Sequence, residues 1–170
     1  MRLFVPLALL LIAAPLAARD GATRDSPTRD SLGVFGQWGA FRDPATPRCY
    51  AIAEAQPTTN RRDVQPFASI GSWPARGIRN QLNLRLSRRL AATPRVRLAV
   101  GGERFDLIAG GGDAWAPDAR ADAAIVAALR AASSMSVSAT DAAGNRFTDR
   151  YSLDGAATAI DAAAVGCARR

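Results

Sequence analysis

The chain lacks two residue types on which many active sites depend: it has no histidine and no lysine, so all 22 basic residues are arginine. Histidine is the commonest general base and zinc ligand. Lysine forms Schiff bases and holds phosphate in P-loops. A single chain of this composition cannot be a Ser-His-Asp or Cys-His enzyme. The remaining catalytic options are a pair of carboxylates or a bound metal ion, and no motif in the sequence indicates either. We therefore expect a non-enzymatic protein with no catalytic residues, no cofactor and no metal site.

The first 18 residues, in contrast, show the three regions of a cleavable signal peptide. Arg2 precedes an apolar run over residues 3–12, and small residues fill positions 13–18, with cleavage expected after Ala18. The apolar run is too short and too interrupted by proline to make a good membrane span. We expect an exported protein, periplasmic or secreted, with no transmembrane segment after cleavage.

Cysteine is scarce, with one residue early in the chain, Cys49, and one near its end, Cys167. In an oxidising compartment an even cysteine count favours a disulfide, which would tie the C-terminus to an early strand. The alternative is two unpaired thiols, because order is weakest near a chain end. A redox or metal role is not expected, since the chain has no Cys-x-x-Cys motif.

A polar segment over residues 19–31 repeats an Arg-Asp pair and is typical of a disordered spacer. The folded domain is then expected over residues 32–168. It should open with a strand over residues 34–38, followed by a second strand over residues 49–52.

Alternation of apolar and polar side chains predicts half-buried strands over residues 81–87 and 95–100. A Gly-Gly pair follows the second of these strands and predicts a two-residue hairpin turn. In the resulting register Arg97 faces Asp106 on the solvent side of the sheet.

The second half of the chain adds a helix and a further hairpin. Asp118 is a typical N-cap for a helix that runs to about Ala132, and the three preceding glycines indicate a flexible connector. A turn over residues 141–145 joins two more strands, and an alanine-rich helix follows over residues 156–165. Many short strands with one main helix predict a mainly β protein: a β-sandwich with one inserted α-helix and a short C-terminal helix.

Asp149 is unusual because it shares strand parity with Phe147 and Tyr151, which are expected to face the core. A buried carboxylate needs hydrogen-bond or charge partners. We expect a bulge or strand end at this position, with backbone donors or Arg150 as partner. The alternative is a functional acid in a carboxylate-dependent enzyme.

Several segments also follow the pattern of a known family. The opening Phe35-Gly36-Gln37-Trp38 leading to Cys49-Tyr50, the strand over residues 96–102, the helix over 123–129 and the ending over 151–160 resemble the invasion-associated locus B family. The resemblance implies an exported, immunoglobulin-like β-sandwich of Gram-negative envelopes, with some members linked to host-cell invasion. It brings no catalytic residues. Other cysteines common in that family are replaced here, which leaves Cys167 as the candidate partner of Cys49.

Positive charge is concentrated in the middle of the chain. Residues 76–104 contain eight arginines and one acid, whereas residues 105–165 contain four arginines and eight aspartates. On the hairpin register, the side chains of Arg85, Arg95 and Arg97 point away from the core. They predict a face that binds an anionic partner or envelope component, such as lipopolysaccharide phosphates, anionic lipid or an acidic protein. The alternative is a merely solvated face.

Three functions remain open at this point. The leading hypothesis is a non-enzymatic envelope protein whose arginine-bearing face binds an unknown protein or an anionic envelope component. The second is an invasion-linked or adhesin-like factor that acts outside the cell, and the third is the carboxylate-dependent enzyme. Nucleic acid is not expected as a partner, because no aromatic residues interleave with the arginines.

Overall fold

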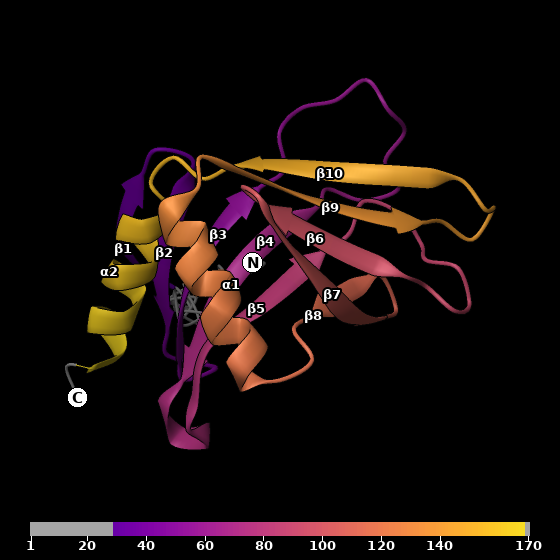
Figure 1. Ribbon diagram of the computed structural model, residues 1–170. Coiled ribbons are helices and arrows are strands. Elements are labelled where there is room, and N and C mark those ends of the chain that lie inside the picture. The colour runs from indigo at the N-terminus through magenta and orange to yellow at the C-terminus, as the bar shows by residue number, and fades with distance from the viewer. Residues whose placement is uncertain (1–28, 169–170) are drawn as a thin grey trace, which may run out of the picture.

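Antiparallel strands dominate the computed structural model, which describes residues 29–168 (Figure 1). The strands are β1 (Asp30–Phe35), β2 (Trp38–Asp43), β3 (Arg48–Glu54), β4 (Phe67–Trp73), β5 (Ile78–Arg85), β6 (Val96–Val100), β7 (Glu103–Gly110), β8 (Asp113–Trp115), β9 (Ser134–Thr140) and β10 (Arg146–Ser152). The helices are α1 (Ala119–Ala131) and α2 (Ala156–Ala168). The ten strands form one sheet in the order β1-β2-β3-β4-β5-β8-β7-β6-β9-β10.

The sheet folds over so that its second half lies across its first, which gives the sandwich-like architecture predicted from the strand pattern (Figure 1). Alternate residues of each strand enter one hydrophobic core, where Leu84 of β5, Leu98 of β6 and Val137 of β9 are fully buried. Several contacts join the halves directly, among them two hydrogen bonds. The Trp38 indole donates to the carbonyl of Ser152 at 2.9 Å, and Gln56 N–H donates to the carbonyl of Arg150 at 2.8 Å.

Both helices lie against the sheet beside the folded-over half (Figure 1). Helix α2 packs on β1 to β4, and α1 packs on β5, β6 and β7. The predicted N-cap is confirmed, since the Asp118 carboxylate accepts a hydrogen bond from Ala121 N–H. Asp122, one turn into α1, accepts a hydrogen bond from the backbone N–H of Leu82 in β5 at 2.8 Å. Burial raises the pKa of that carboxyl, and the bond attaches the helix to the sheet.

A disulfide joins Cys49 of β3 to Cys167 of α2, with a Cα–Cα distance of 5.7 Å. Both residues are buried, Cys49 at 1% and Cys167 at 8% relative exposure. This disulfide confirms the predicted pairing. The helix α2 continues to Ala168 rather than ending near residue 165. The added turn carries Cys167 onto the inner face of the sheet.

The prediction of one opening strand over residues 34–38 is wrong. Gly36 has a positive φ of 53°, a conformation that glycine adopts without steric cost. The chain therefore turns back at residues 36–37, and β1 and β2 form a hairpin in which Phe35 pairs with Trp38.

Strand β1 begins at Asp30, so the last two residues of the expected spacer belong to the domain. Arg42 holds Asp30 there by an ion pair of 2.6 Å. The predicted signal peptide, residues 1–18, lies outside the described residues.

The glycines at positions 110–112 form a tight turn rather than a flexible connector. Gly111 and Gly112 have φ values of 65° and 99°, and they reverse the chain between β7 and β8. Strand β8 then pairs with both β5 and β7. This short strand, which was not predicted, is what joins the two halves of the sheet. Within residues 29–168, no helix is long and apolar enough to cross a membrane.

Candidate anion-binding face

The outward face of β6, β9 and β10 carries arginines at its margins and hydroxyl side chains along its middle. Arg97 of β6 pairs in register with Ser138 of β9, which pairs with Thr148 of β10. The neighbouring row pairs Thr140 with Arg146. Because side chains alternate between the two faces of a strand, these residues point away from the core.

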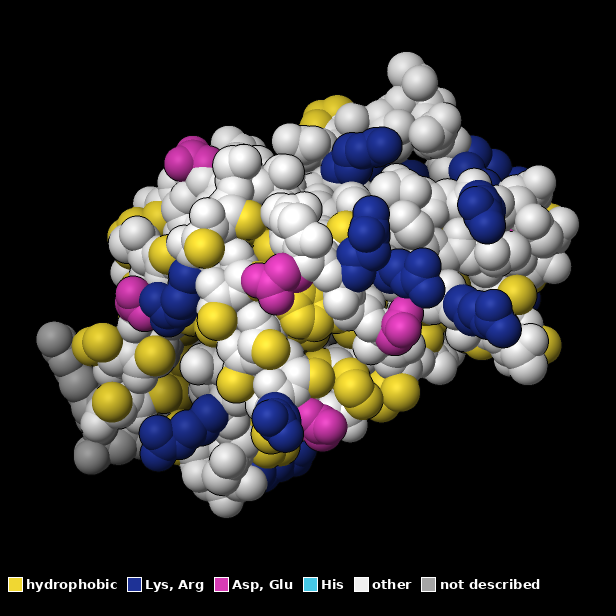
Figure 2. All heavy atoms as spheres, in the orientation of Figure 1, with side chains coloured by type: hydrophobic (Ala, Val, Ile, Leu, Met, Phe, Trp, Pro, Cys, Tyr) yellow, Lys and Arg dark blue, Asp and Glu magenta, His cyan; other side chains and the backbone are white. Residues whose placement is uncertain are grey.

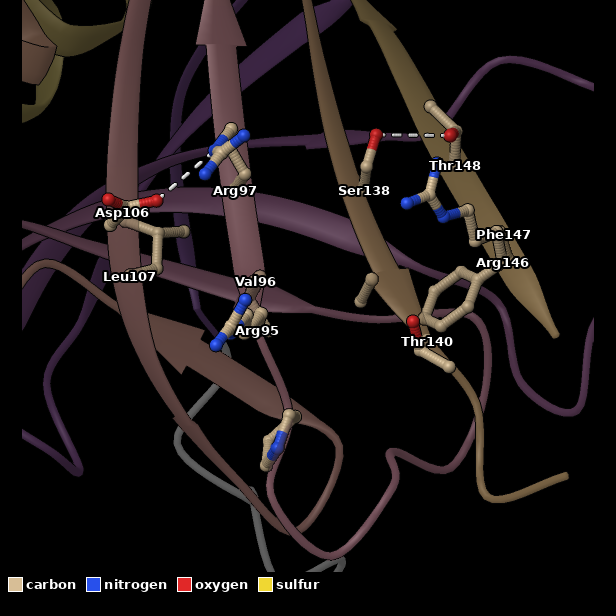
Figure 3. A pocket seen from close by; sticks show the side chains of 12 residues that line it. Arg95, Val96, Arg97, Asp106, Leu107, Ser138, Thr140, Arg146, Phe147 and Thr148 are labelled. Carbon is tan, nitrogen blue, oxygen red and sulfur yellow. Dashed lines mark hydrogen bonds and ion pairs between the residues drawn. The ribbon is translucent and has the colours of Figure 1, made fainter. Parts of the chain in front are cut away.

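An open groove of about 800 Å³ runs over this face. Figure 3 shows Arg95 and Arg97 on one side of it, with Arg146 on the other. Beside Arg146, the hydroxyls of Ser138 and Thr148 share a hydrogen bond of 3.1 Å. Parts of Val96, Leu107, Ala139 and Phe147 complete the lining. The groove therefore offers guanidinium and hydroxyl groups around an apolar floor, in a volume typical of small-ligand sites.

Positive charge in the groove is only partly neutralised. The predicted Arg97–Asp106 contact is confirmed as an ion pair of 3.2 Å, with the two side chains 62% and 84% exposed. Pairs this exposed contribute about 0–1 kcal/mol, so an incoming anion can compete for Arg97 at little cost. Arg95 and Arg146 are exposed and form no ion pair with any carboxylate of residues 29–168.

Two further arginines extend the positive charge beyond the groove. The register aligns Arg104 of β7 with Ala99 of β6, then Ser136 of β9 and Arg150 of β10. We call the set Arg95, Arg97, Arg104, Arg146 and Arg150 the arginine face. In Figure 2, basic side chains gather over the half of the molecule where Figure 1 places β6, β9 and β10.

The structure separates one of the predicted residues from the other two. Arg95 and Arg97 line the groove, whereas Arg85 of β5 does not and instead forms an ion pair of 2.8 Å with Asp113. Arg146, which was not among the predicted residues, completes the groove. Its outward direction follows from the inward-facing Phe147 beside it in the predicted return strand. That it lies near Arg95 depends on pairing between β6 and β9, which are distant in sequence.

Asp149 has a structural partner and lies in regular structure. It is only 2% exposed, and its carboxylate accepts a hydrogen bond from the backbone N–H of Ser87 at 2.9 Å. Strands β9 and β10 pair without interruption through this position, so the expected bulge is absent and a backbone donor provides the compensation instead. The acid connects β10 to the end of β5 across the core. Burial, followed by the charge of Asp149, raises the pKa of the neighbouring Tyr151 hydroxyl.

The predicted turn over residues 141–145, next to the groove, is organised by Asp141. Its carboxylate accepts hydrogen bonds from Asn145 N–H at 2.8 Å and Ala143 N–H at 3.0 Å. Arg88 adds an ion pair of 3.0 Å. The Asn145 bond is the largest cause that lowers the pKa of Asp141 below its ordinary 3.8, followed by the Arg88 contact.

Replacing Asp141 with asparagine is expected to lower stability at pH 7 more than at pH 3. A carboxyl whose pKa is lower in the folded state stabilises the fold above its unfolded pKa, and this contribution is lost as the pH falls through the folded pKa. Asparagine does not titrate, so the gap between the two proteins should narrow below about pH 4. Urea unfolding at both pH values measures it. Asp106→Asn, at a side chain 84% exposed, is the control. An equal Asp141→Asn effect at both pH values would contradict the linkage.

The fold is similar to that of a solved structure, the crystal structure of invasion associated protein b from Bartonella henselae. The two superpose with a TM-score of 0.54 at 19% sequence identity, over 78% of this chain and 95% of the other. No family model matches the sequence, and no curated protein matches it. The likeness therefore concerns the fold. It agrees with the fold that the resemblance to the invasion-associated locus B family implied.

Proposed function

We propose that this protein is an exported, non-enzymatic binding module that holds an anionic partner or envelope component on its arginine face, in the periplasm or outside the cell. The observation that carries the proposal is the groove between Arg95, Arg97 and Arg146, in which a single carboxylate faces three guanidinium groups. Guanidinium groups bind carboxylate and phosphate in bidentate geometry. A disulfide between buried cysteines supports export, because such bonds persist in oxidising compartments.

Replacing Arg95, Arg97 and Arg146 together with glutamine is expected to abolish capture of the partner. The side chains are exposed, so the variant should fold normally, while the groove loses three positive charges. In-cell crosslinking followed by affinity capture of the mature protein, beside wild type, measures the loss. The control replaces Arg76, Arg79 and Arg120, which are exposed and lie outside the groove. The same partner captured by both variants would refute the proposal.

The likeness to invasion associated protein b favours a second candidate function, an invasion-linked or adhesin-like factor that acts outside the cell. The two candidates differ in where the ligand lies. Surface labelling of intact cells, compared with release of periplasmic contents, separates them.

A further inference from the structure

We infer that the ligand of the groove is an acidic polysaccharide, a glycan chain that carries carboxylate or phosphate groups. This inference rests on the proposed function and specifies its ligand. It follows from four features of the groove: its paired backbone, its hydroxyl side chains, the spacing of its three arginines, and the large hydrophobic side chains exposed within residues 29–168, none of which line it.

Most of the backbone that lines the groove is already paired with a neighbouring strand. Strand β6 is paired on both sides, by β7 and β9, and β9 is paired by β6 and β10. Where β6 pairs with β9, over Arg97–Val100 and Met135–Ser138, the backbone N–H and C=O groups are committed to the sheet, so an acidic peptide cannot add between these two strands there as a further strand. The free edge of β10 is partly closed as well, because the carbonyls of Arg150 and Ser152 accept from Gln56 and Trp38.

The polar side chains that line the groove include both hydroxyls and guanidinium groups. Ser138 and Thr148 form one hydrogen bond with each other, and each hydroxyl keeps further capacity to donate or accept. Thr140 adds a third hydroxyl to the lining. The hydroxyls of a sugar can form hydrogen bonds with the side chains of this row, while acidic groups on the same glycan can form ion pairs with the arginines beside it.

The spacing of the arginines favours a ligand with more than one acidic group. Arg95 and Arg97 are two residues apart on β6, or about 7 Å. Arg146 lies on β10, two strands away from β6, and the backbones of these two strands are about 10 Å apart where β9 pairs with both. A chain with repeated acidic groups can place one such group beside each guanidinium, whereas a small anion reaches all three only if the side chains converge on it.

The composition of the surface disfavours a lipid bilayer as the occupant. The large hydrophobic side chains that are exposed within residues 29–168 are Val34, Val64, Ile108 and Val165, and none of them lines the groove. A protein that inserts into the interface needs such side chains on its binding face.

The test is isothermal titration calorimetry of the mature protein with four probes at fixed ionic strength. The probes are an oligogalacturonate, a neutral maltooligosaccharide of the same length, a polyglutamate of the same charge, and phosphatidylglycerol vesicles. The proteins are wild type, the triple variant at Arg95, Arg97 and Arg146, its control at Arg76, Arg79 and Arg120, and a double variant, Ser138→Ala with Thr148→Val. Circular dichroism confirms that each is folded.

We expect wild type to bind oligogalacturonate at least tenfold more tightly than polyglutamate and not to bind the neutral sugar. The hydroxyl variant should lose about tenfold in affinity for oligogalacturonate and be unchanged toward polyglutamate. The triple arginine variant should lose binding to both oligogalacturonate and polyglutamate. If polyglutamate or the vesicles bind as tightly as oligogalacturonate, or the hydroxyl variant binds as wild type does, the polysaccharide inference fails while arginine-dependent binding still supports the proposed function. If no probe depends on the three arginines, both fail.

Discussion

Replacing Cys49 with serine is expected to lower the melting temperature by roughly 5–15 °C, the equivalent of about 2–5 kcal/mol for a domain of this size. The disulfide spans 118 residues of sequence, so on the chain-entropy model its removal frees a long loop in the unfolded state. It also leaves α2 held to the sheet by packing alone. Thermal unfolding of wild type and variant, without reductant, measures the effect.

Reductant is the control for this experiment. Once reduced, wild type has also lost the cross-link, so Cys49→Ser should melt below wild type only under non-reducing conditions. Cys167→Ser should reproduce the Cys49→Ser result, since it removes the same bond. If wild type melts at the same temperature with and without reductant, the disulfide does not stabilise the fold.

Replacing Gly155 with alanine is expected to destabilise the protein by about 4 kcal/mol or more, the upper end of single-substitution effects. A Cβ at this position would collide with the backbone carbonyl oxygen of Phe35. Gly155 also has a φ of 83°, which costs an alanine about 1–2 kcal/mol. The β1–β2 hairpin would therefore have to move away from the start of α2. The free energy of unfolding in urea measures the loss.

Gly144→Ala is the matched control, because it separates the close approach from the backbone conformation. Gly144 has nearly the same φ, 86°, but a Cβ there would meet no atom within 4 Å. It should lose only the conformational term, about 1–2 kcal/mol. Equal losses in the two variants would show that contact with the hairpin contributes nothing.

Local patterns succeeded where neighbours in sequence are also neighbours in space. The β6–β7 register, the Asp118 cap of α1 and the turn around Asp141 were all predicted, and each depends on contacts within about a dozen residues. Predictions failed where distant segments decide the conformation. The turn at Gly36 is one example, since the glycine permits the turn but Gln37 N–H also donates to the carbonyl of Asp154 at 3.1 Å, a contact that no local pattern indicates.

In the candidate site, too, local features were predicted and long-range ones were not. Strand alternation shows that Arg95 and Arg97 point outward, because the parity of side chains is a local property. Whether Arg85 or Arg146 joins them depends on strand order. The insertion of β8 beside β5, and the pairing of β9 with β6, bring Arg146 into the groove, while Arg85 pairs with Asp113.

The amino-acid sequence by itself therefore determined the mainly β class, the outward direction of the arginines and the exclusion of histidine and lysine chemistry, since composition and periodicity contain this information. Only the tertiary structure decided the partner of Asp149, the course of α2 to Cys167 and the membership of the groove. Each of these depends on long-range pairing of strands and helices, which is selected by burial of the whole core rather than by any one segment.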